Sequence, residues 1–311
     1  MAVVTSGLKP LRRIASYAVC LDASDRVLLV RASATSGTPG LWSLPGGAVD
    51  HGEHPVETVV RETAAETGLS VAAGALRDVL SDVRALPHRG MTIHTDRLIY
   101  DATLRGGRLI RRVGQPTDVA AWVSLAEAKE LPLRPFTAAA LGLPCDRVDP
   151  RPDKPPELPS FLAVPGRDGL HRAQRFAAYA VATDPSGRHL LTRVASRFPG
   201  AGRWHLPGGG TDFGEQPEEA LLRELLEETG QHGRVEALLG VASHRDPASL
   251  GPEGYPIDWH GVRVFYRVRV DRPTQPRVAE PGGSTDDARW FTPQELAGLP
   301  LTEVTAEALR M

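Results

Sequence analysis

Three glutamates in one segment have the spacing of a cation-binding surface. In PEEALLRELLEETG, Glu224, Glu227 and Glu228 lie at roughly 0°, 300° and 40° around a helix that turns about 100° per residue. Carboxylate oxygens are the ligands that Mg²⁺ and Mn²⁺ prefer. Three neighbouring carboxylates otherwise repel one another and gain nothing from the helix alone. The pattern leaves two interpretations open, a solvated acidic face or a site for a hard divalent cation.

The residues around these glutamates predict a helix that begins near Pro217 and ends at Gly230. Proline suits the first turn of a helix, and glycine suits the left-handed residue just past its end. We expect the helix to pack on a sheet through an apolar stripe of Leu221, Leu222, Leu225 and Leu226. Gly208 and Gly209 precede it, where a bare backbone can approach a ligand closely. These glycines favour the cation site.

The chain also repeats itself. Arg13–Gly68 aligns without a gap on Arg175–Gly230, and about half of the aligned residues are identical. Because each copy is much longer than a solenoid repeat, we expect two complete domains. Their expected bounds are 10–143 and 171–311, with a proline-rich linker at 144–170 because proline favours extended chain.

Each copy predicts a mixed α/β domain. Turn residues and alternating apolar residues predict strands within Tyr17–Arg31, Thr95–Leu104, Tyr179–Arg193 and Gly261–Val270. Two capping boxes, Ser124 with Glu127 and Thr292 with Glu295, predict a short helix near the end of each copy. These elements would surround the acidic helix and position it.

The second copy resembles the box of the Nudix hydrolases, G-x5-E-x7-R-E-U-x-E-E-x-G-U, where U is a bulky aliphatic residue. The matching residues are Gly209, Glu215, Arg223, Glu224, Leu225, Glu227, Glu228 and Gly230, and only Gln231 departs from the pattern. The resemblance implies two tandem Nudix-type α/β/α sandwiches with mixed β-sheets. It also implies divalent-metal-dependent hydrolysis of a nucleoside diphosphate linked to another moiety. A nucleotide sugar, an ADP-ribose-like compound and a nucleoside triphosphate all remain open as substrates.

The resemblance implies roles for the residues of the second box. Glu224, Glu227, Glu228 and the Gly208 carbonyl would bind Mg²⁺ or Mn²⁺, and one of these glutamates would double as the base. Arg223 and Glu215 would orient the glutamates through charge-assisted hydrogen bonds. Bound cations neutralise a diphosphate and lower the pKa of a bound water, which suits this reaction. A further acid from a downstream loop would come from Asp246, Glu253 or Asp258.

The first copy lacks one carboxylate of the box. Ala65 stands where the second copy has Glu227, while Gly46, Glu62 and Glu66 remain in register. We therefore expect catalysis in the C-terminal domain and a weaker second site in the N-terminal one. The first copy would then support structure or the substrate cleft, bind a nucleotide without hydrolysing it, or act as a slower hydrolase.

Three residues before the second run of glycines are candidate substrate contacts. Arg203 and His205 would meet phosphates, and Trp204 would stack on a base, although a tryptophan near a strand is more often part of the core. We interpret His94 and His260, at equivalent strand positions, as hydrogen-bonded structural residues.

Composition and charge narrow the class of protein. The chain of 311 residues is 41% hydrophobic and 24% charged, as in packed globular domains. A net charge of −2 gives no polybasic surface, so we expect a nucleotide-type small molecule as partner, with no nucleic acid. The sequence shows neither a long apolar segment nor a signal peptide, and its two cysteines have no metal-ligand spacing. We expect a cytoplasmic protein without a membrane span.

Two expectations concern assembly and the class of function. The Nudix resemblance implies pairing of domains, either as a pseudo-dimer within the chain or as a homodimer. The alternative to an enzyme is a nucleotide-sensing protein without turnover.

Overall fold

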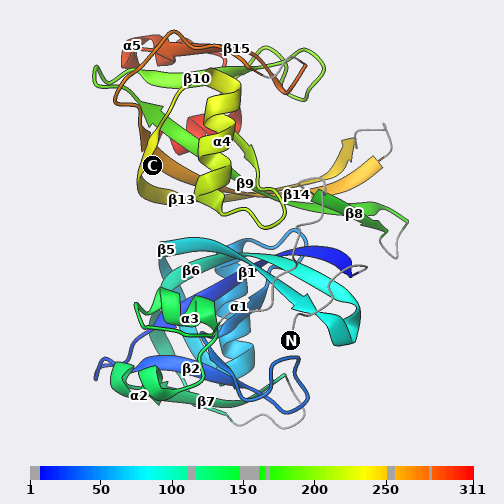
Figure 1. The fold of residues 1–311 in the computed structure, drawn as a ribbon, viewed down its shortest axis with the longest axis vertical. Helices are drawn as coiled ribbons and strands as arrows, with labels where there is room; N and C mark the ends of the chain where they lie inside the picture. The colour runs from blue at the N-terminus through cyan, green and yellow to red at the C-terminus, as the bar shows by residue number, and fades with distance from the viewer. Residues whose placement is uncertain (1–7, 111–115, 148–160, 166–168, 251–255, 280–281) are drawn as a thin grey trace. The chain divides into compact units, whose positions relative to one another are not determined.

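The computed structural model describes residues 8–110, 116–147, 161–165, 169–250, 256–279 and 282–311. The chain divides into two compact units, Met1–Glu157 and Leu158–Met311 (Figure 1). Below they are called the first unit and the second unit, and each is described by itself. Each contains strands and a few helices, so the α/β class expected from the sequence is confirmed.

The first unit is built on a mixed four-stranded sheet of order β4-β1-β6-β5 and a smaller sheet of order β3-β2-β7. Its strands are β1 (Lys9–Cys20), β2 (Val27–Ala32), β3 (Trp42–Ser43), β4 (Gly46–Ala48), β5 (Leu69–Leu86), β6 (Met91–Gly107) and β7 (Thr117–Val123). Its helices are α1 (Pro55–Thr67), α2 (Leu125–Glu130), α3 (Pro135–Ala140) and the short 3₁₀ helix η1 (Pro87–Arg89). β1 and β6 run parallel, whereas β5 and β6 are antiparallel, so the sheet is mixed as expected.

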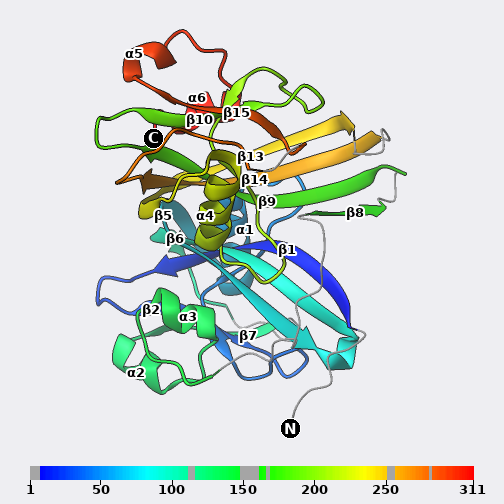
Figure 2. The ribbon, with the colours of Figure 1, turned by 45° about the horizontal axis from the view of Figure 1, so that its top comes forward.

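The second unit has a similar order of strands and helices, but its strands join in one eight-stranded sheet. Its strands are β8 (Phe161–Pro165), β9 (His171–Thr183), β10 (His189–Val194), β11 (Trp204–His205), β12 (Gly208–Gly210), β13 (Arg234–Leu250), β14 (Pro256–Arg269) and β15 (Thr285–Phe291). Its helices are α4 (Pro217–Thr229), α5 (Pro293–Leu296) and α6 (Glu303–Ala308). β14 lies between β9, to which it is parallel, and β13, to which it is antiparallel (Figure 2).

One segment differs from its predicted role. Within residues 144–170, which we expected to be a linker, Phe161–Pro165 form β8 and pair with His171–Arg175 of β9. Proline prevents pairing only where its missing N–H is needed, so Pro165 is tolerated at the end of this added strand. The linker prediction is therefore corrected over β8, and residues 148–160 lie outside the described part of the chain.

The helix that carries the acidic residues begins and ends where the sequence predicts. Pro217 is its first residue, the Gln216 N–H donates to Glu219 Oε2 at 3.2 Å, and Gly230 is left-handed with φ 68°. Leu221 and Leu225 are fully buried, but Leu226 is 40% exposed. The predicted leucine stripe is therefore wrong at Leu226. α4 instead buries a narrower face, which leaves one edge of the helix for polar residues.

The predicted turns and strands near the start of each copy are present. Asp22 and Asp184 each accept hydrogen bonds from backbone N–H groups two and four residues later, which closes the turn before β2 and β10. The predicted strands at Thr95–Leu104 and Gly261–Val270 fall within β6 and β14, except that Val270 follows the end of β14. In the described part of the chain, no helix is long and apolar enough to cross a membrane.

Candidate active site

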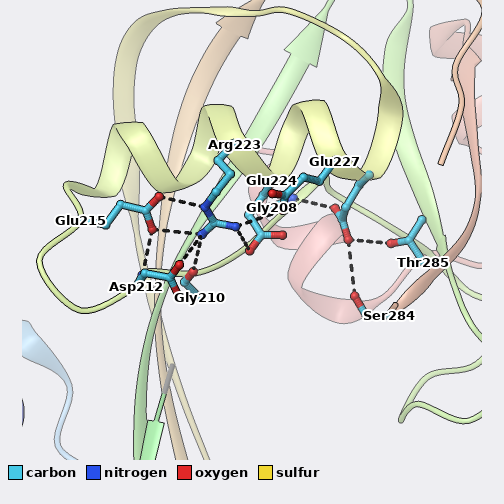
Figure 3. A network of polar contacts seen from close by, with 10 residues as sticks. Gly208, Gly210, Asp212, Glu215, Arg223, Glu224, Glu227, Ser284 and Thr285 are labelled. Carbon is cyan, nitrogen blue, oxygen red and sulfur yellow. Dashed lines mark hydrogen bonds and ion pairs between the residues drawn. The ribbon is translucent and has the colours of Figure 1, made fainter. Parts of the chain in front are cut away.

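Arg223 is the centre of a polar network on α4 (Figure 3). Its Nε and Nη2 donate to the two carboxylate oxygens of Glu215 at 2.9 and 3.0 Å, and its Nη1 donates to Glu224 and Glu227 at 3.1 Å each. Nη2 also reaches the carbonyl oxygen of Gly210 at 3.3 Å. Hydrogen bonds between charged groups are the stronger ones, and a bidentate pair also fixes orientation. Arg223 thus holds two of the three helix glutamates in place.

Glu228 points away from Arg223 and into the protein. Its Oε2 accepts a hydrogen bond from the Gly208 N–H at 3.0 Å, and its Oε1 accepts from the Thr285 hydroxyl at 2.6 Å. The Ser284 hydroxyl is 3.4 Å from the same Oε1. Glu228 is only 7% exposed. Thr285 and Ser284 were missed by sequence reasoning, although the repeated Thr-Asp at Thr117 and Thr285 was a usable signal.

Burial dominates the electrostatics of the helix glutamates. It raises the pKa of Glu228 to about 7, against the hydrogen bonds from Thr285 and Gly208, and the negative charge of Glu224 adds to the rise. Burial also raises the pKa of Glu224, where Arg223 opposes the rise and Glu227 adds to it. Like charges close together disfavour ionisation. Glu224 therefore lies near enough to both Glu227 and Glu228 to repel them.

The glycines before α4 leave room for this arrangement. A Cβ atom at Gly209 would lie 2.5 Å from Glu224 Oε1, and one at Gly208 would lie 2.3 Å from the Ala178 carbonyl oxygen. Gly208 also has a φ of 137°, a conformation that other residues rarely adopt. Both positions need glycine because the backbone passes so close to the glutamates and to β9.

The ligand atoms that these residues offer are of the type that a hard divalent cation prefers. Three carboxylates and backbone carbonyls offer oxygen ligands alone, and the carboxylates repel one another until a positive charge joins them. Arg223 supplies that charge to Glu224 and Glu227 in this structure. Among the described residues, no three acidic, histidine or cysteine side chains lie close enough together to hold a metal ion.

The first unit reproduces the network with one part missing. Arg61 donates to Glu53 at 2.7 and 2.8 Å and contacts Glu62, as Arg223 contacts Glu215 and Glu224. The Gly46 N–H donates to Glu66 Oε2 at 3.0 Å, as that of Gly208 donates to Glu228. Gly46, Glu62 and Glu66 thus share the local geometry of their counterparts in the second unit. Ala65 leaves Arg61 without the helix carboxylate that Glu227 offers to Arg223.

The three residues predicted to contact substrate, Arg203, Trp204 and His205, form none of the described contacts of the Arg223 network. Trp204 is 7% exposed and packs in the core, with its ring 4.6 Å from that of Phe291, which agrees with the core position that the sequence favoured over base stacking. The exposed Arg203 donates to the Leu301 carbonyl oxygen at 3.2 Å. His205 Nδ1 lies 2.7 Å from the Thr302 hydroxyl. Their side chains therefore connect β11 to the segment before α6.

Burial and, to a smaller extent, the positive charges of Arg263 and Arg175 together lower the pKa of His205 to about 4. His205 is therefore neutral at physiological pH. A neutral imidazole attracts a phosphate less than an imidazolium cation does, so the predicted phosphate contact of His205 would be a weak one.

The remaining residues singled out from the sequence are two histidines and three candidates for an additional acid. His260 hydrogen-bonds Gln174 at 3.0 Å and Ser243 at 2.9 Å, and His94 hydrogen-bonds Asp96 at 3.0 Å, so both are structural as interpreted. Asp258 is buried and binds Arg245 through two hydrogen bonds, which makes it a poor additional acid. Asp246 accepts from the Ala248 N–H at 3.1 Å, and Glu253 lies outside the described residues.

Comparison with known proteins places the chain in a family. The NUDIX domain model matches twice, over residues 11–141 and 173–310, so the chain belongs to the NUDIX family and carries two copies of its domain.

Among curated proteins, a putative 8-oxo-dGTP diphosphatase 3 of Mycobacterium tuberculosis is 34% identical over 122 residues, which cover 38% of this chain and 54% of that protein. An RNA pyrophosphohydrolase of Psychrobacter arcticus is 32% identical over 96 residues, which cover 29% of this chain and 56% of that protein. The chain thus spans about half the length of these relatives.

Among solved structures, a MutT NUDIX hydrolase from Burkholderia pseudomallei is 34% identical with a TM-score of 0.34. The match covers 44% of this chain and 96% of that one.

Proposed function

We propose that the second unit is a divalent-metal-dependent hydrolase of nucleoside diphosphates linked to another moiety. Membership of the NUDIX family supports this proposal, as do relatives whose names describe an 8-oxo-dGTP diphosphatase and an RNA pyrophosphohydrolase. The small net charge favours a nucleotide-type small molecule over a nucleic acid as substrate.

Glu224, Glu227, Glu228 and the Gly208 carbonyl are the proposed ligands of Mg²⁺ or Mn²⁺. When bound, such a cation neutralises the charge of the diphosphate and lowers the pKa of a water molecule. The residues of the chain position the ligands. Glu215 fixes Arg223, and Arg223 holds Glu224 and Glu227 along one edge of α4.

Glu228 has a separate part in the proposal. Its two oxygens are fixed by Thr285 and by the Gly208 N–H, and its raised pKa lets it hold a proton near neutral pH when no cation is near. A general base works best when its pKa is near the working pH. Glu228 is therefore our candidate for the glutamate that combines metal binding with proton transfer.

The single observation that carries the assignment to the second unit is the difference between Glu227 and Ala65. Each arginine binds the glutamate before its helix, the glutamate that follows it and an aspartate, yet only Arg223 also reaches a carboxylate four residues further along the helix. We propose that the first unit supports structure or substrate binding and binds cations more weakly through Gly46, Glu62 and Glu66. Pairing of the two units remains a prediction.

A nucleotide panel tests the proposed activity. The full chain is incubated with Mg²⁺ and with ADP-ribose, nucleotide sugars, nucleoside triphosphates and oxidised nucleoside triphosphates, and phosphate-containing products are measured. We expect turnover of at least one class and complete loss of turnover when the cation is chelated. Binding without turnover of any compound would instead identify a nucleotide sensor.

A further inference from the structure

A small hollow in the second unit is lined by two arginines that form no ion pair with the described residues. The hollow is open to solvent, with about 210 Å³ of empty space that includes part of that solvent, and it is lined by Arg175, Ala177, Tyr179, Trp259, Gly261 and Arg263. We propose that Arg175 and Arg263 bind a phosphate group of the nucleotide, at a site that the first unit does not have. The inference deepens the proposed function and depends on it for the identity of the ligand.

The sheet places the two guanidinium groups together. Arg175 on β9 lies directly opposite Gly261 on β14, and Arg263 is the next residue of β14 on the same face. Gly261 has no side chain to fill the space beside these groups. A Cβ atom there would lie 3.5 Å from Arg263 Nη2 and 3.2 Å from the Trp259 indole nitrogen. Both groups therefore face the same short stretch of backbone.

Neither arginine is neutralised by a neighbour. Among the residues that the structure describes, Arg175 Nε is buried without a hydrogen-bond partner, and Arg263 forms no ion pair. Like charges on neighbouring strands destabilise a sheet, and a buried donor without a partner costs further free energy. An anion in the hollow would relieve both costs.

In the first unit, the counterpart of Arg263 is paired with an acid and the counterpart of Arg175 has a hydrogen-bond partner. Arg97, the counterpart of Arg263, binds both oxygens of Asp82 at 2.8–3.0 Å, donates to the Tyr17 hydroxyl at 2.8 Å and lies 4.2 Å from the Phe136 ring. Arg13, the counterpart of Arg175, donates to the Thr95 hydroxyl at 3.1 Å. There the arginines are structural.

In the second unit, other residues stand at the positions of these partners. His244 pairs with Gly261 on the ladder of β13 and β14, where Asp82 pairs with Thr95 on the ladder of β5 and β6. Gly261 itself replaces Thr95. Val304 takes the place of Phe136 in the repeated LPL segment. Three separate replacements thus free the two arginines and keep their charge.

The hollow is also electrostatically linked to the box helix. The positive charge of Arg175 acts on Glu224 of α4 as well as on His205, although neither residue forms an ion pair with it. A phosphate held here would therefore lie within the electrostatic reach of the proposed metal ligands.

Binding measurements without metal test the site separately from hydrolysis. In metal-free buffer at low ionic strength, calorimetry of the full chain should show that ADP and pyrophosphate bind and that adenosine binds more weakly. Arg175→Gln and Arg263→Gln should each weaken ADP and pyrophosphate by about tenfold, as expected for the loss of a charged hydrogen bond. Arg267→Gln is the matched control, since this exposed arginine lies four residues further along β14 and outside the hollow.

A second pair of variants avoids removing either arginine. His244 is exposed, so His244→Asp should fold and should weaken ADP by placing a carboxylate where Asp82 lies in the first unit, whereas His244→Asn should bind as the wild type does. Equal affinity of the wild type, Arg263→Gln and His244→Asp for ADP would overturn the proposal. That result would leave the hydrolase proposal standing, because turnover is measured with metal on the nucleotide panel.

Discussion

Arg223 donates a hydrogen bond to Glu227 at 3.1 Å, and no equivalent contact exists in the first unit because residue 65 is alanine. The two networks share the bonds of this helix arginine to the glutamate before the helix and to the glutamate that follows the arginine. Because α1 and α4 share their proline start and glycine end, the difference lies in the side chains and not in the helix.

Replacing Glu227 by alanine should convert the second box into the first. We expect Glu227→Ala to lower turnover by about 100-fold or more, since it removes charge from the proposed cation site. Helix stability should change little, because alanine is the best helix former. Steady-state kinetics with Mg²⁺ and a thermal melt measure the two effects. Glu218→Ala, at an exposed residue of the same helix, is the control, and equal kinetics for the two variants would contradict the role of Glu227.

The reverse change should strengthen the first unit. Ala65→Glu places a third carboxylate beside Glu62 and Arg61, so we expect the chain to bind Mn²⁺ more tightly at its weaker site. Calorimetric titration with Mn²⁺ measures affinity and stoichiometry. Ala65→Gln has a similar size without the charge and should leave the weaker site unchanged. Identical titrations for both variants would show that the first unit does not hold a cation through this face.

The glycine before the box helix offers a matched pair of variants. Gly209→Ala would place a Cβ 2.5 Å from Glu224 Oε1, so the glutamate must move, and we expect turnover to fall by about tenfold or more. Gly47→Ala would place a Cβ 2.7 Å from Glu62 Cδ in the first unit. If catalysis belongs to the second unit, Gly47→Ala keeps turnover within about twofold of the wild type. The opposite ranking of the two variants would reassign the activity.

His205 predicts a pH dependence of stability. Burial lowers its pKa from 6.5 to about 4, so the folded protein holds a neutral imidazole while the unfolded chain takes up a proton below pH 6.5. Stability should therefore fall as the pH falls from 6.5 to 4, by up to about 3 kcal/mol. Denaturant unfolding of the wild type and of His205→Asn between these pH values measures the effect. The variant should lose less stability, and parallel pH curves would disprove the assignment.

The box and its helix could be predicted from sequence because their signals are local. Proline, glycine and glutamate at fixed spacings specify where α4 begins, where it ends and which edge is acidic. The contacts of Glu228 with Thr285 and of Trp204 with Phe291 join residues far apart in the chain, so spacing alone could not reveal them. The sequence gives no sign that Arg175 and Arg263 lack partners among the described residues. That difference is visible only when the structure shows the bonds of their counterparts, Arg13 and Arg97, in the first unit.

The central claim is that catalysis belongs to the second unit, and a pair of glutamine variants tests it most directly. Glu228 and Glu66 each accept a hydrogen bond from a glycine N–H at 3.0 Å, so Glu228→Gln and Glu66→Gln remove the same charge from equivalent positions. On the best substrate of the panel, Glu228→Gln should lower kcat/KM by about 100-fold or more, and Glu66→Gln should stay within about twofold of the wild type. Intact turnover in Glu228→Gln together with its loss in Glu66→Gln would contradict the claim.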